Sequence, residues 1–188
     1  CAADVAALAA GPFALAGYSM GGRIALHVAL AQPERVSRLV LVSTTAGIED
    51  PCERAARRAR DDKLAAWMAR HSIAEIADRW GAQPLFAGQS PEVAAAARAD
   101  RLDNEPAHLA AALRGIGSGV MAPLWERLGE LRMPVAVLAG ERDAKFVGLA
   151  ERLTREIPHA TLTIVPGAGH ALTLEAPAAV AAAIEQPA

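Results

Sequence analysis

The sequence is poor in cysteine, has no surplus of positive charge and contains no long apolar run. Two cysteines among 188 residues, Cys1 and Cys52, are too few for a disulfide framework and lack the spacing of metal ligands. We therefore expect no metal site and a reduced, cytoplasmic setting. The net charge of −2 excludes the basic surface that a nucleic-acid partner requires. No apolar run approaches the roughly 18 residues of a membrane span, so no membrane partner is expected.

The residues that are present indicate a folded chain of single-domain size. Hydrophobic residues make up 53% and charged residues 21%, which excludes intrinsic disorder. Only two of the 19 basic residues are lysines, Lys63 and Lys145, so bidentate carboxylate binders are abundant. The alanine-rich residues 4–10 predict a helix rather than a signal peptide or a polar tether. Because the chain starts with Cys1 and not with methionine, we expect that its true N-terminus is missing.

Four short apolar runs have the length and character of parallel strands buried on both faces, and they lie at residues 13–16, 39–42, 135–139 and 161–165. Helical patterns occupy residues 22–31, 146–156 and 177–185. The alternation of strands and helices predicts an α/β fold with a parallel sheet of about four strands and right-handed crossovers.

One long interval breaks this alternation. Residues 48–131 show no strand pattern, only helical segments interrupted by prolines and glycines. A crossover needs only a dozen or so residues, so we interpret this interval as a helical lid over one end of the sheet. The predicted organisation is a core segment at 1–47, the lid at 48–131 and a second core segment at 132–188.

The sharpest motif is Gly-Tyr-Ser-Met-Gly-Gly at residues 17–22. It follows a predicted strand and precedes a predicted helix, which is the context of a G-x-S-x-G nucleophile elbow. Glycines flank Ser19 because the sharp turn brings backbones close together. The amide of Met20, at the start of the helix, can donate to a developing oxyanion. The alternative is a tight glycine-rich turn with an idle serine.

A nucleophilic serine needs a base, and the base needs an orienting acid. Asp143 and His170 each follow the carboxyl end of a predicted strand, where ligands bind in open parallel sheets, and the chain order is Ser, acid, His. Glu141 competes with Asp143 as the acid but comes earlier in its turn. The remaining histidines are interpreted as surface or packing residues: His27, His71, His108 and His159.

A second set of residues suits a small molecule with several negative charges. Arginines bind carboxylates bidentately, and the set comprises Arg23 after the elbow, Arg57 with Arg54 and Arg58 on one helix face, and Arg101. Solvated pairing of these arginines with neighbouring acidic residues is the simpler alternative. Trp80 and Phe86 are candidates for the apolar wall of such a pocket or for ordinary packing.

These residues resemble those of the MenH-type synthases that make 2-succinyl-6-hydroxy-2,4-cyclohexadiene-1-carboxylate (SHCHC) in menaquinone biosynthesis, a branch of the α/β-hydrolase superfamily. The generic part of the resemblance is the elbow. The specific part comprises Arg57, Trp80, Phe86, Arg101 and the segment Gly-Glu-Arg-Asp-Ala-Lys-Phe at 140–146, followed by Gly169 and His170.

The resemblance implies a lyase that needs neither cofactor nor metal. Ser19, Asp143 and His170 would abstract a ring proton, and pyruvate would leave from the enolpyruvyl substituent. Residues implied to bind the polycarboxylate substrate are Tyr18, Arg23, Arg57, Trp80, Phe86 and Arg101.

The chain departs from the family in one respect. The first predicted strand already carries the elbow, so the chain resembles the C-terminal portion of an α/β-hydrolase, without the His-Gly loop that supplies a second oxyanion-hole amide. Loss of one such donor costs about 10²–10³ in rate. Two other functions therefore stay open: a serine hydrolase acting on small esters, and an inactive remnant that serves as a binding module. The oligomeric state does not follow from the sequence.

Overall fold

The computed structural model describes residues 2–185, and these divide into two compact units. The sheet unit comprises residues 2–46 and 124–185, and the helical unit is Gly47–Pro123. The predicted second boundary at residue 131 was wrong. Trp125, Leu128 and Leu131 are buried in the core of the sheet unit, so the segment that carries them belongs to that unit.

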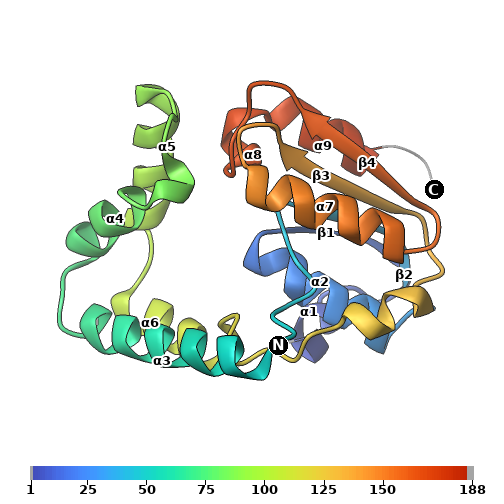
Figure 1. Ribbon diagram of the computed structural model, residues 1–188, viewed down its shortest axis with the longest axis horizontal. Helices are drawn as coiled ribbons and strands as arrows, with labels where there is room; N and C mark the ends of the chain where they lie inside the picture. The colour runs from blue at the N-terminus through green and yellow to red at the C-terminus, as the bar shows by residue number, and fades with distance from the viewer. Residues whose placement is uncertain (1, 186–188) are drawn as a thin grey trace. The chain divides into compact units, whose positions relative to one another are not determined.

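The sheet unit is built on four parallel strands in the order β1-β2-β3-β4 (Figure 1). The strands are β1 (Phe13–Tyr18), β2 (Val36–Val42), β3 (Val135–Gly140) and β4 (Ala160–Val165). All four predicted strands are present, each one to three residues longer than expected, which confirms the α/β fold. Ser19, Asp143 and His170 lie in loops that follow β1, β3 and β4. Because the strands are all parallel, these loops leave from the same edge of the sheet.

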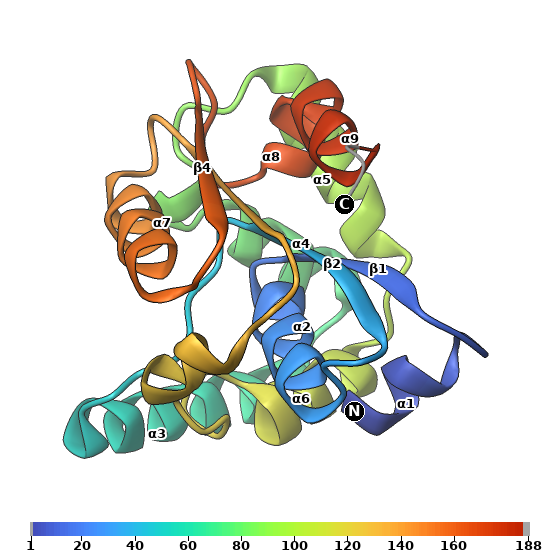
Figure 2. The same ribbon diagram turned by 90° about the vertical axis from the view of Figure 1, so that its right-hand side faces the viewer.

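Helices cover both faces of this sheet (Figure 2). Alternate residues of β2 divide between the two sides, Leu39 and Leu41 packing on one face and Val40 and Val42 on the other. The first face is covered by α1 (Ala2–Ala7), α2 (Met20–Ala31), the 3₁₀-helix η2 (Trp125–Glu130) and α7 (Ala144–Glu156), and the second by α8 (Leu172–Glu175) and α9 (Pro177–Glu185).

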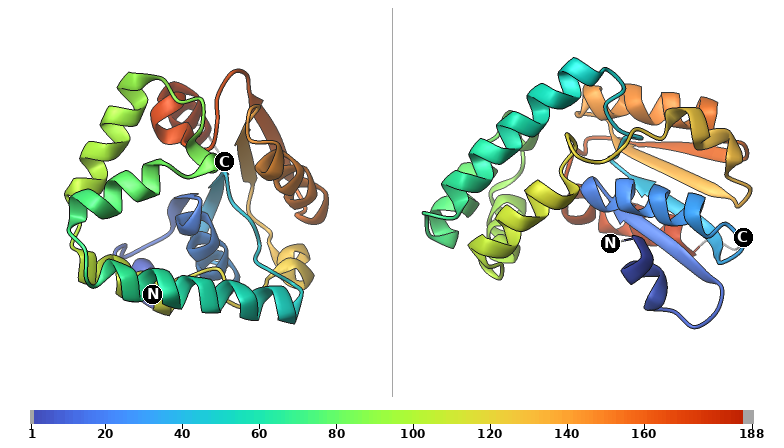
Figure 3. Two further views of the ribbon diagram at one scale, coloured as in Figure 1. Left: turned by 60° about the vertical axis from the view of Figure 1, so that its left-hand side comes forward. Right: turned by 90° about the horizontal axis from the view of Figure 1, so that it is seen from below.

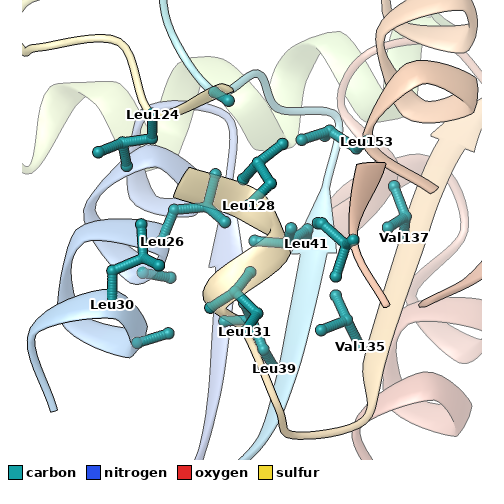
Figure 4. Close-up of a cluster of buried hydrophobic side chains, with 14 of the residues drawn as sticks. Leu26, Leu30, Leu39, Leu41, Leu124, Leu128, Leu131, Val135, Val137 and Leu153 are labelled. Carbon is teal, nitrogen blue, oxygen red and sulfur yellow. The ribbon is translucent and has the colours of Figure 1, made fainter. Parts of the chain in front are cut away.

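The larger apolar core lies on the first face (Figure 4). Leu26 of α2, Leu128 of η2 and Leu153 of α7 are fully buried there with Leu39 and Leu41 of β2. Burying a leucine side chain stabilises the folded state by about 1.5–3 kcal/mol, so this cluster fixes the helices that begin beside the elbow and the acid.

Helices α2 and α7 begin two residues earlier than predicted and α9 has the predicted bounds, whereas the helix predicted over residues 4–10 ends early. It spans Ala2–Ala7, and a turn follows at Leu8, whose surface is 86% exposed. The cause is local. The chain must extend through Gly11 and Pro12 to enter β1, and proline disfavours helical geometry in the residue that precedes it. Cys1 lies outside the described residues, and Cys52 is an exposed free thiol.

The helical unit consists of two helix pairs (Figure 3). Its helices are α3 (Pro51–Met68), α4 (Ile73–Gly81), the 3₁₀-helix η1 (Pro84–Phe86), α5 (Pro91–Leu102) and α6 (Pro106–Ile116). Helix α3 packs along α6, and α4 packs along α5. The prolines at the start of α3, α5 and α6 occupy the first turn, where a missing amide proton costs nothing.

Two local features define the ends of the helices and of the unit. Asp50 and Ser72 cap α3 and α4 by accepting hydrogen bonds from backbone N–H groups three residues later. Gly47 and Pro123, the first and last residues of the unit, approach so closely that a Cβ at Gly47 would lie 2.9 Å from the Pro123 Cα. Within residues 2–185, no helix combines the length and the apolar character needed to cross a bilayer.

Candidate active site

Ser19 lies at the turn between β1 and α2, in a backbone conformation that side chains rarely adopt. Its φ of 50° and ψ of −110° lie outside the usual regions for a residue with a side chain. Two hydrogen bonds hold this geometry: the Ser19 N–H donates to the Val42 carbonyl at 2.8 Å, and the Thr44 hydroxyl donates to the Ser19 carbonyl at 2.6 Å. The turn is therefore fixed by the end of β2 and by the loop that follows it.

The elbow glycines do not all serve the same purpose. A Cβ at Gly17 would lie 2.5 Å from the Gly21 carbonyl oxygen, and one at Gly22 would lie 2.6 Å from the Thr44 side chain. A Cβ at Gly21 would meet nothing within 4 Å. The close approach expected around the turn is therefore present at Gly17 and Gly22 but not at Gly21.

Three side chains from separate parts of the sequence form one hydrogen-bonded chain. His170 Nε2 lies 3.1 Å from the Ser19 hydroxyl, and His170 Nδ1 lies 2.7 Å from Asp143 Oδ2. The imidazole is 2% exposed, so the protein shields it from competing water. The geometry allows the hydroxyl to pass its proton to Nε2 while the carboxylate holds the Nδ1 proton.

Asp143 has a second partner that fixes its orientation. It is the N-cap of α7, where its Oδ1 accepts the Phe146 N–H at 3.4 Å while Oδ2 faces His170. The helix N-terminus therefore holds one oxygen of this side chain in place while the other faces the imidazole. The competing carboxylate, Glu141, is engaged elsewhere, because its Oε2 accepts the Gly167 N–H at 2.8 Å.

The other histidines occupy positions consistent with packing or surface roles. His71 stacks on Trp67 with ring centroids 4.0 Å apart, and its Nδ1 lies 2.7 Å from the Trp67 carbonyl oxygen. His108 and His159 are exposed. The pKa of His27, half-buried in α2, is lowered from its ordinary value of 6.5, mainly by burial and further by Arg23 and Arg127.

The lowered pKa of His27 predicts a contribution to acid sensitivity. The unfolded chain binds the proton more readily than the folded chain, so the free energy of unfolding falls as the pH drops below about 6.5. Urea unfolding between pH 7 and 5 should show a shallower decline for His27→Gln than for the wild type. The exposed His108→Gln serves as control and should leave the slope unchanged. An equal slope for His27→Gln and the wild type contradicts the prediction.

The remaining predicted residues of the sheet unit lie close to the elbow. Met20 is the first residue of α2, so its N–H is one of the amides that have no acceptor within the helix. Tyr18 ends β1, with its ring centroid 5.4 Å from that of His170. Arg23 follows on α2 and is buried, with 7% of its surface exposed.

Sequence reasoning gave no role to two residues that contact this site. The Phe146 ring packs against His170 with centroids 4.5 Å apart. The buried Glu175 carboxylate accepts the N–H groups of Gly169 and Ala171, on either side of His170. No pattern in the sequence indicates the contact of Glu175, whereas the spacing of Phe146 from Asp143 by one helical turn indicates that the two share a face.

The predicted residues of the helical unit fall in three places. Arg57 on α3 donates from Nε to Asp61 Oδ1 at 2.9 Å, and Asp61 is 4% exposed. Trp80 on α4 lines a cavity of about 480 Å³ together with Trp67. Phe86 and Arg101 are brought together, with the guanidinium 4.9 Å from the ring centroid, beside a second cavity of about 250 Å³.

Comparison with known proteins places these features in a family context. A model described as "Alpha/beta hydrolase family" matches residues 1–183. A Bacillus subtilis (strain 168) protein, provisionally named 2-succinyl-6-hydroxy-2,4-cyclohexadiene-1-carboxylate synthase, is 40% identical over 166 residues, which cover 87% of this chain and 61% of that protein.

Solved structures with a similar fold include relatives of the same kind. MenH from S. aureus is 35% identical with a TM-score of 0.85, covering 89% of this chain and 64% of that one. A malate-bound esterase from Thermogutta terrifontis is 30% identical with a TM-score of 0.81, covering 97% and 68%. The chain thus spans about three fifths to two thirds of the length of these relatives.

Proposed function

Because the chain belongs to the α/β-hydrolase family, we propose that it is an enzyme in which Ser19, His170 and Asp143 act together. The proposed reaction is the elimination of pyruvate from the enolpyruvyl-bearing cyclohexene carboxylate that precedes SHCHC, a lyase step in menaquinone biosynthesis. The main observation in support of this proposal is the continuous hydrogen-bonded chain from the Ser19 hydroxyl through His170 to Asp143. The relative at 40% identity, named for this reaction, supports the choice of a lyase.

The proposed mechanism begins with removal of a ring proton. The Ser19 hydroxyl passes its proton to His170 Nε2 as its oxygen accepts the proton from the ring carbon. The new ring double bond forms while the bond to the enolpyruvyl oxygen breaks. The leaving enolate takes the proton held by His170 and becomes pyruvate, so Ser19 and His170 return to their starting states.

Two features support charge development in this sequence. Asp143, hydrogen-bonded to Nδ1, stabilises the imidazolium that exists between the two proton transfers. The Met20 N–H at the start of α2 is a donor for the negative charge that develops on the substrate as the proton leaves. The residues proposed to bind the carboxylates and the ring are Tyr18, Arg23, Arg57, Trp80, Phe86 and Arg101.

We expect Arg101→Ala to weaken substrate binding with little loss of stability. Arg101 is partly exposed at the end of α5, and a guanidinium is suited to bidentate binding of a carboxylate. The loss of one such charged contact corresponds to about 10- to 100-fold in KM. Steady-state kinetics and thermal unfolding of the variant measure both quantities. Arg114→Ala, an exposed arginine of α6, is the control, and an unchanged KM in Arg101→Ala contradicts the assignment.

Arg57 requires a different substitution, because Asp61 is buried and one of its oxygens, Oδ2, has no hydrogen-bond partner among the described residues. Arg57→Ala would remove the partner of the other oxygen and destabilise the helical unit, which would obscure an effect on binding. Arg57→Lys retains the positive charge while removing the planar fork. It is therefore the variant that separates carboxylate binding from folding.

A serine hydrolase acting on small esters is the second candidate. It is supported by the similarity to the Thermogutta terrifontis esterase, at 30% identity, and by a serine geometry that suits acyl transfer equally well. In this reaction Ser19 would form an acyl-enzyme that water then hydrolyses. The same three side chains would act, so the difference lies in the substrate.

Two assays on the chain separate these functions. Lactate dehydrogenase coupling measures the release of pyruvate from the enolpyruvyl precursor, and p-nitrophenyl acetate with mass spectrometry detects an acyl-Ser19. Pyruvate release without acyl accumulation supports the lyase. Ester turnover with trapped acyl-Ser19 and no pyruvate overturns it in favour of the hydrolase. A folded chain that gives neither product, and does not react with a fluorophosphonate, supports the third alternative, an inactive remnant that serves as a binding module.

A further inference from the structure

The loop that carries His170 is held at both sides by one buried carboxylate. Glu175 Oε2 accepts the Gly169 N–H at 2.7 Å, and Oε1 accepts the Ala171 N–H at 3.1 Å. The Glu175 side chain is 5% exposed, so these bonds form with little competition from water. The backbone on either side of the imidazole is thereby fixed to a single side chain of α8.

The same carboxylate also reaches the turn that carries the acid. Arg142 Nη2 donates to Glu175 Oε2 at 2.6 Å, and the Arg142 N–H donates to the Ala168 carbonyl at 2.9 Å. Arg142 directly precedes Asp143, so the position of the Arg142 backbone affects the position of the Asp143 side chain. Glu175 therefore links the backbone around the base with the backbone before the acid.

We propose that Glu175 is a positioning residue that sets the distance from His170 to Ser19 by holding the N–H groups of Gly169 and Ala171 and the Arg142 guanidinium. Glu175 acts through its neighbours, by accepting the backbone N–H groups of Gly169 and Ala171 and by pairing with the Arg142 side chain. A misplacement of about 1 Å in a catalytic group can cost about 10²-fold in rate, so this position affects kcat more than KM. The inference rests on the proposed role of Ser19 and His170, and it applies equally to a lyase and to a hydrolase.

Glu175→Gln tests the proposal, because it preserves the shape but replaces one acceptor with an NH₂ group that faces a backbone N–H. The matched control is Glu156→Gln, which removes the charge from a similar arginine pair, Arg152 Nε to Glu156 Oε1 at 2.7 Å, within α7. The rate of fluorophosphonate labelling of Ser19 measures its activation without any assumption about the natural substrate. We expect this rate to fall at least about 10-fold in Glu175→Gln and to stay unchanged in Glu156→Gln.

A spectroscopic measurement separates positioning from general destabilisation. The Nδ1 proton that His170 shares with Asp143 should give a sharp downfield ¹H resonance in the wild type and in Glu156→Gln. In folded Glu175→Gln this resonance should shift or broaden. A wild-type resonance together with a wild-type labelling rate in this variant overturns the proposal. If the wild type releases no pyruvate, while Glu175→Gln shows the expected fall in labelling rate and the altered resonance, the lyase assignment is wrong and the positioning role of Glu175 is retained.

Arg142→Ala provides a second route if Glu175→Gln does not fold. The Arg142 side chain is 43% exposed, so its removal leaves no buried hole, yet Glu175 loses one of its three donors. We expect labelling of Ser19 to slow several-fold and the His170 resonance to broaden. A wild-type rate and resonance in this folded variant refute the proposed link between the two loops.

Discussion

Ser19→Ala should lower the rate of pyruvate release by about 10³-fold or more, with the fold intact. In the proposed mechanism the Ser19 oxygen takes the ring proton, and the substitution also removes the hydroxyl that lies 3.1 Å from His170 Nε2. Serine nucleophiles in comparable triads show losses of this size or larger. Stopped-flow or coupled assays give the rate, and thermal unfolding reports on the fold.

The control for this experiment is Ser37→Ala, an exposed serine of β2 in the same unit. It should retain wild-type turnover and wild-type labelling by a fluorophosphonate, whereas Ser19→Ala should not be labelled at all. Pyruvate release at the wild-type rate in Ser19→Ala would exclude Ser19 from the reaction. The lyase mechanism proposed above would then be wrong.

Gly140→Ala should cost about 3 kcal/mol or more in the free energy of unfolding, the largest stability effect expected of a single methyl group here. Gly140 ends β3, and an added Cβ would overlap the Gly169 carbonyl oxygen and lie 2.5 Å from that of Ala168. These atoms are backbone, so they can move only if the loop carrying His170 moves. A cost of this size corresponds to a fall in Tm of about 6 °C or more in a chain of this length.

The matched substitution Gly148→Ala should act in the opposite direction. Gly148 lies in the interior of α7, and a Cβ there meets nothing within 4 Å. Alanine favours a helix over glycine by about 1 kcal/mol, so Tm should rise by about 2–4 °C. Calorimetry on both variants checks the pair, and equal effects of the two substitutions would show that close backbone contact is not the cause.

The parts of the site predictable from sequence are those that depend on short segments and on the geometry of a parallel sheet. The elbow could be recognised because a strand, a glycine-rich turn and a helix follow one another around Ser19. The proximity of Asp143 to His170 could be inferred because both follow strand ends at the same edge. The fold class follows from the same alternation of strands and helices.

What could not be predicted depends on contacts between distant or irregular segments. Residues 124–131 were assigned to the insertion because they show no strand pattern, although the three-residue spacing of Trp125, Leu128 and Leu131 is typical of a 3₁₀-helix with one buried face. The contact of Glu175 with Gly169 depends on how the chain turns after His170. No local pattern encodes that turn.

The inserted position of the helical unit has a consequence for the order of folding. Strands β2 and β3 are paired neighbours, yet residues 47–123 separate them in the chain, and closing so long a loop carries an entropic cost. The helical unit brings Gly47 against Pro123, and within the unit α3 packs along α6. Because helices form faster than strand pairs that are distant in sequence, early folding of this unit would shorten the effective loop before β2 and β3 meet. Mutations that slow the folding of the helical unit would then delay assembly of the sheet, although the mutated residues lie outside it.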